Sequence, residues 1–125
     1  MSDEPIDVVR RFCDTWSTGD IDAIMAFFAD DAVYDNIPME AVTGTAAIRD
    51  FIAGFTDSIE KVEFRVDNIA SADSDVVLTE RVDIFTLQGK TIELPVMGTF
   101  EVRGGKVAAW RDYFDLNQFM GQMPS

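Results

Sequence analysis

The sequence Trp110-Arg111-Asp112-Tyr113-Phe114-Asp115, near the end of the chain, has the alternating pattern of a β-strand. Trp110, Asp112 and Phe114 would then share one face. The other face would carry Arg111, Tyr113 and Asp115. A carboxylate between two large aromatic side chains is costly to bury unless it is paired, and desolvation favours its protonated form. Such a carboxyl group is a candidate general base. The segment alone also fits an ordinary strand with one solvated face and Asp112 at its frayed end.

A second stretch, residues 80–85, places charged side chains in a similar pattern. Alternation puts Arg81, Asp83 and Phe85 on one face, and Val82 and Ile84 on the other. The simple interpretation is a solvated Arg–Asp pair opposite a buried apolar face. If the final strand lies nearby, however, Arg81 could bridge Asp83 and Asp112 through its fork of donors. Two carboxyls held in this way can titrate separately, which is a division into acid and base.

A third candidate pair, Tyr34 and Asn36, shares one face of an early strand that ends before Pro38. A Tyr hydroxyl and an Asn amide can together donate to and accept from one water molecule. The alternative is a half-exposed Tyr followed by an Asn that stops the strand.

Periodicity along the rest of the chain predicts the order helix, helix, strand, helix and four strands, then a short helix. The expected helices span residues 5–16, 21–28, 45–56 and 116–120, and the expected strands span 32–37, 62–69, 76–87, 91–102 and 107–114. This order predicts one α+β domain over residues 1–125, with a curved, mainly antiparallel sheet wrapped around the N-terminal helices. A sheet of this shape leaves a pocket at its open end.

Composition restricts the chemistry available to the protein. The 125 residues include no His and one Cys, and their net charge is −13. The charge disfavours binding to nucleic acid or an anionic membrane. The lack of His removes catalytic triads and the usual zinc and iron sites, so we expect acid–base chemistry without a metal or cofactor. With no signal peptide or membrane-spanning run and a lone Cys13, we expect a cytoplasmic protein.

The segments 34–38, 80–83 and 110–115, taken together, resemble the limonene-1,2-epoxide hydrolase family. The resemblance implies the cone-shaped α+β barrel of nuclear transport factor 2 and the one-step hydrolysis of an epoxide to a diol. Asp112 would be the general base and Asp83 the general acid, with Arg81 orienting both. Tyr34 and Asn36 would help Asp112 to hold the attacking water.

This interpretation calls for an apolar pocket that accepts a terpenoid, steroid, lipid or aromatic epoxide. The candidate lining residues are Cys13, Trp16, Phe85, Leu94, Val96, Phe114 and Phe119. Val82 and Ile84 would face outward from the cone, where burial by a second subunit would cover them. The family resemblance also implies a homodimer.

Two other functions fit the same fold. One is a proton-transfer enzyme like ketosteroid isomerase, which gives no role to Arg81 between two carboxyls. The other is a non-catalytic small-molecule-binding protein, in which Asp83, Arg81 and Asp112 form a closed structural ion pair. A water-sized gap beside Tyr34, Asn36 and Asp112, opening into an apolar cavity, would favour the hydrolase.

Overall fold

A computed structural model of the protein describes residues 3–123, so residues 1–2 and 124–125 lie outside the described part. The elements in chain order are α1 (Pro5–Thr15), η1 (Trp16–Thr18), α2 (Ile21–Met25), β1 (Phe28–Asn36), β2 (Val42–Thr43), α3 (Thr45–Thr56), β3 (Lys61–Ser71), β4 (Val76–Leu87), β5 (Lys90–Arg103), β6 (Lys106–Tyr113) and α4 (Leu116–Gln122). Across residues 3–123, no helix is both long enough and apolar enough to cross a membrane.

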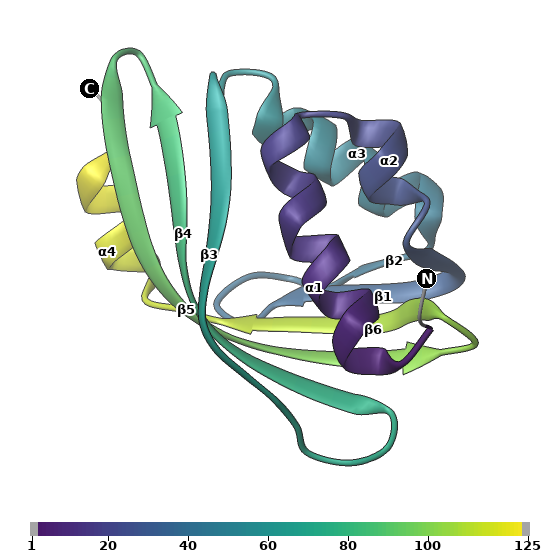
Figure 1. Cartoon of the computed structure of the whole chain (residues 1–125). Helices are drawn as coiled ribbons and strands as arrows, with labels where there is room; N and C mark the ends of the chain where they lie inside the picture. The colour runs from purple at the N-terminus through teal and green to yellow at the C-terminus, as the bar shows by residue number, and fades with distance from the viewer. Residues whose placement is uncertain (1–2, 124–125) are drawn as a thin grey trace.

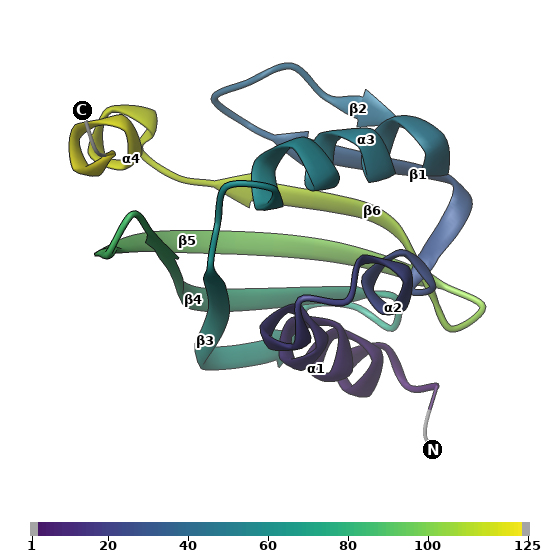
Figure 2. The same ribbon diagram turned by 90° about the horizontal axis from the view of Figure 1, so that it is seen from above.

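The strands form one curved sheet in the order β2-β1-β6-β5-β4-β3. Strands β3 to β6 pair antiparallel in sequence order, whereas β1 runs parallel to β6. Figure 1 shows the sheet bent around α1, α2 and α3, with α4 at its far end, and Figure 2 shows the same layers from above. The expected α+β class and the mainly antiparallel, curved sheet are therefore confirmed.

Local sequence explains the helices that fill the bend. Pro5 occupies the first turn of α1, where its missing N–H is harmless, and α1 turns Val8, Val9 and Phe12 into the core. The side chain of Asp20 caps α2 by accepting from the backbone N–H of Ala23 at 3.2 Å.

Two boundaries differ from the sequence prediction by more than two residues, and several others differ by one or two. The second helix ends at Met25, and Phe28 already belongs to β1, which we expected to begin at Ala32. Phe28 pairs with Val107 of β6, and a register shift before Val33 follows. This long-range pairing outweighs the helical spacing of Phe28, and the spacing alone could not show it. The two-residue strand β2 was not expected, because only its pairing with β1 defines it.

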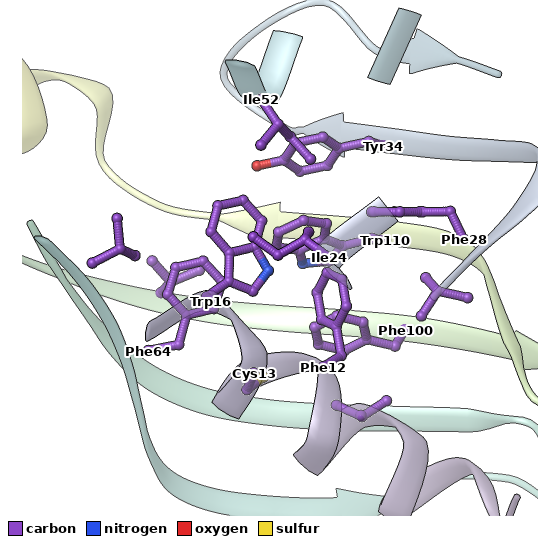
Figure 3. Packing of buried hydrophobic residues seen from close by; sticks show 14 of the residues in the cluster. Phe12, Cys13, Trp16, Ile24, Phe28, Tyr34, Ile52, Phe64, Phe100 and Trp110 are labelled. Carbon is purple, nitrogen blue, oxygen red and sulfur yellow. The ribbon is translucent and has the colours of Figure 1, made fainter. Parts of the chain in front are cut away.

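Aromatic side chains fill the centre of the core (Figure 3). Trp110 of β6 is fully buried and stacks on Tyr34 at 4.1 Å and on Phe100 at 5.6 Å between ring centroids. Phe12 of α1 meets Trp110 edge to face at 5.0 Å. The core is therefore packed around the strand that also carries Asp112.

Candidate active site

Arg81 of β4 binds two buried carboxylates at once. Its Nε and Nη2 donate to the two oxygens of Asp83, both at 2.9 Å. Its Nη1 and Nη2 donate to the two oxygens of Asp112 at 3.1 and 2.8 Å. Arg81 is only 1% exposed, Asp83 4% and Asp112 3%. The structure thus brings together, in the expected order, three residues that lie on two different strands.

Gly98 makes this bridge possible. Strand β5 separates β4 from β6, and Gly98 lies opposite Thr79 on one side and Asp112 on the other. A Cβ at Gly98 would collide with Nη1 of Arg81, and would lie 2.7 Å from Oδ1 of Asp112 and 2.9 Å from Oγ1 of Thr79. Our sequence analysis missed Gly98, although a glycine inside a strand often marks a close approach of other groups.

The two carboxyl groups have different surroundings. Asp112 also accepts a hydrogen bond from Nε1 of Trp110 at 2.7 Å, so its oxygens have three donors in all. The hydrogen bonds to Asp83 both come from Arg81. Burial raises the pKa of Asp83 to about 6, although contact with Arg81 opposes the shift. Asp83 is therefore protonated more readily than an ordinary carboxyl group.

Tyr34 and Asn36 lie beside this pair because β1 runs next to β6. In the register of the two strands, Tyr34 is the partner of Trp110 and Asn36 the partner of Asp112. Both side chains are nearly buried. Burial, helped by the charge of Asp112, raises the pKa of Tyr34, so its hydroxyl keeps its proton and can donate.

A cavity of about 100 Å³ opens above these polar groups. Tyr34, Asn36, Asp83 and Asp112 all line it, and its remaining walls are apolar. Five of the seven expected pocket residues line it, namely Trp16, Phe85, Leu94, Phe114 and Phe119. The walls that the sequence analysis did not name come from Met39, Phe51, Phe55 and Phe64. The helical or alternating spacing of Phe51, Phe55 and Phe64 marks them as core residues, but it does not distinguish core from pocket. Met39 lies in the turn after β1, where no periodicity applies.

The other two expected pocket residues, Cys13 and Val96, are buried but do not line this cavity. Val96 is the strand partner of Arg81. Burial raises the pKa of the Cys13 thiol to about 12, which keeps it protonated and unreactive. Across residues 3–123, no group of three or more Asp, Glu or Cys side chains is placed to hold a metal ion.

Several solved structures share this fold. One is a protein from Catenulispora acidiphila with a ketosteroid-isomerase-like fold, solved in complex with trimethylamine. It is 23% identical to this chain, with a TM-score of 0.81. The match covers 92% of this chain and 90% of the Catenulispora chain. This similarity shows the fold class alone.

The sequence model of the limonene-1,2-epoxide hydrolase catalytic domain family matches residues 3–125, so the chain belongs to that family. The epoxide hydrolase EphG of Mycobacterium tuberculosis is 31% identical over 108 residues, which are 86% of this chain and 71% of EphG. A solved structure of an M. tuberculosis LEH-like epoxide hydrolase is 29% identical and has a TM-score of 0.83. The match covers 95% of this chain and 88% of the solved chain.

We predict that Gly98→Ala destabilises the fold by about 1–3 kcal/mol, because the new methyl group has to displace Arg81, Asp112 or Thr79. Urea unfolding at neutral pH measures this change. Gly54→Ala is the control, since a Cβ at Gly54 in α3 has no atom within 4 Å and should stabilise the helix by up to about 1 kcal/mol. Equal stability of the two variants would contradict the crowding at Gly98.

Proposed function

We propose that this protein is a cofactor-independent epoxide hydrolase that opens an apolar epoxide to a diol in one step. The observation that carries the proposal is the pair of carboxyl groups joined by Arg81 and facing an apolar cavity together with Tyr34 and Asn36. Membership of the family supports the reaction class.

In this mechanism Tyr34, Asn36 and Asp112 hold a water molecule, and Asp112 takes its proton. The water oxygen forms a bond to one epoxide carbon while the bond from that carbon to the ring oxygen breaks. Asp83 gives its proton to that ring oxygen, so that one water and one epoxide become one diol. Exchange with solvent then returns the proton from Asp112 to Asp83.

Arg81 suits this step because negative charge moves from Asp112 to Asp83 as the reaction proceeds. The same guanidinium contacts both carboxyl groups, with Nη2 at 2.8 Å from Asp112 and 2.9 Å from Asp83. The net charge of the three groups therefore stays constant inside the core. A fixed cation between the two sites also removes the need for solvent to reorganise.

The rival functions account for fewer of these contacts. A closed structural ion pair does not require Tyr34, Asn36 and both carboxyls to line a cavity, as they do here. A proton shuttle like that of ketosteroid isomerase leaves the double contact of Arg81 without a role. We therefore prefer the hydrolase, with a terpenoid, steroid or lipid epoxide as its substrate.

We predict that Asp112→Asn lowers turnover of apolar epoxides by about 10²–10⁴-fold, because it removes the general base. Diol formation from a cyclic terpene epoxide and a steroid epoxide in ¹⁸O-labelled water measures it. In a single turnover of the parent protein, the label should enter the diol, as direct attack by water requires.

The matched control is Asp35→Asn, since Asp35 lies between Tyr34 and Asn36 on β1 but points to the opposite face. It should keep the activity of the parent protein. Undiminished turnover by Asp112→Asn, or unlabelled diol in the first turnover, would show that the mechanism is wrong. If a folded parent protein hydrolyses no epoxide, the binding-protein alternative takes its place.

We predict that kcat/KM falls as the pH rises above about 6. Asp83 acts in its protonated form, and its pKa of about 6 means that the protonated fraction falls about tenfold for each further pH unit. A profile of kcat/KM from pH 5 to 9 measures this fall. The Asp83→Asn variant should have low activity, and its profile should lack the fall above about pH 6. A parent activity that rises steadily to pH 9 would exclude Asp83 as the acid.

We also propose that the outer face of the sheet binds a second copy of the chain. Three large apolar side chains on neighbouring strands are exposed there: Leu78 by 37%, Met97 by 49% and Tyr113 by 47%. Met97 and Tyr113 are direct partners across β5 and β6. Val82, on the same face, is half-buried. Exposed apolar side chains on three neighbouring strands are typical of a subunit interface.

We predict that Met97→Glu converts a dimer into a monomer, because it places a charge at the centre of this patch. Sedimentation velocity measures the change. Met120→Glu, at a 58% exposed position on α4, should leave the dimer intact. Because each chain carries a net charge of −13, salt should strengthen the dimer. A monomeric parent protein at all salt concentrations would refute the interface.

A further inference from the structure

A second cavity lies next to the candidate active site. It measures about 170 Å³ and lies between the C-terminal end of α3, the β4–β5 hairpin and α4. The described residues that line it include large apolar side chains such as Leu87, Ile92 and Met123, and none of them is charged. The mechanism proposed above makes no use of this space.

Three phenylalanines line both cavities and so form the wall between them. They are Phe55 of α3, Phe85 of β4 and Phe119 of α4. The rings of Phe55 and Phe85 meet edge to face at 5.1 Å, and Phe119 lies 6.2 Å from each of them. All three shared residues are phenylalanines, so no charged group belongs to this wall.

Phe119 is the member of this wall that can move at the lowest cost. Phe85 is 4% exposed within a central strand, and α3 is fixed by the buried side chains of Ile48 and Ile52. In contrast, α4 has no buried residue. The side chain of Gln122 joins α4 to β5 through the backbone of Glu93, at 3.2 and 3.0 Å. Displacement of the Phe119 ring would leave only Phe55 and Phe85 among the residues shared by the two cavities.

We propose that the second cavity binds an apolar arm of the epoxide, while the ring itself lies between Asp83 and Asp112. This proposal rests on the function proposed above and adds a substrate class to it: a neutral epoxide that carries a hydrocarbon arm of about six carbons. The size follows from volume, because an apolar cavity of about 150 Å³ is large enough to hold benzene. The neutrality follows from the uncharged lining, which offers no partner for a buried carboxylate or ammonium group.

A series of straight-chain 1,2-epoxyalkanes from four to fourteen carbons tests the proposal. Burial of each further methylene should raise kcat/KM by about fourfold, until the arm fills the second cavity and the rise stops. Calorimetric titration with the 1,2-diols of the same lengths measures binding without any reaction. Their affinities should rise over the same range of lengths.

Gly54 offers a specific way to block the second cavity. It lines the second cavity but not the first, and a Cβ built there meets no neighbouring atom within 4 Å. Gly54→Leu should lower the ratio of kcat/KM between a ten-carbon and a four-carbon epoxide by at least tenfold. Gly121→Leu is the matched control, because Gly121 of α4 is equally uncrowded and lines neither cavity. It should leave this ratio unchanged.

The outcomes separate this inference from the proposed function. If no epoxide of any length is hydrolysed, the proposed function fails, and the diol titrations alone decide whether the second cavity binds an arm. If epoxides are hydrolysed but kcat/KM does not depend on length, the arm site is wrong and the hydrolase stands. An unchanged ratio in Gly54→Leu, with a clear length dependence in the parent protein, would place the arm elsewhere.

Discussion

The structure depends on keeping one guanidinium and two carboxyl groups inside a protein core. Removing each of these groups from water costs several kcal/mol, and only good geometry offsets this. Arg81 meets the requirement with four hydrogen bonds to Asp83 and Asp112 and a fifth to Thr79 at 3.1 Å. Other features follow from the same need: a glycine where the bridge crosses β5, and an indole donor to Oδ1 of Asp112. Loss of Arg81 would leave carboxylate charge in the core without its cation.

The aromatic core links this ion cluster to its chemistry. The guanidinium carbon of Arg81 lies 4.9 Å from the ring centroid of Phe64 and 5.9 Å from that of Phe100. These rings exclude water and offer their negative faces to the cation. The same exclusion of water raises the pKa of Asp83, because it penalises the ionised carboxylate. The side chains that stabilise the fold thus also set the protonation state that a general acid needs.

The sequence predicts the fold and the main charged groups well because both follow from alternation along strands. The inward positions of Arg81, Asp83 and Asp112 are set by a period of two residues, and the structure places them so. Features that depend on the register between strands were not predictable: the early start of β1 at Phe28, and the role of Gly98. Local spacing likewise could not separate Cys13, which is buried outside the cavity, from Trp16, which lines it. The catalytic roles and the cytoplasmic location stay predictions.

The parallel pairing of β1 with β6 has a consequence for how the protein is made. Asn36 emerges early from the ribosome, whereas its strand partner Asp112 is almost the last part of the sheet to be synthesised. Such distant contacts are slow to form, because the long loop between them loses entropy before any contact compensates. Until β6 docks, the nascent chain holds Arg81 and Asp83 without Asp112 and Trp110. Premature termination between residues 83 and 112 would therefore leave Arg81 with Asp83 alone of its two carboxylate partners, and such a fragment should be a target for proteolysis.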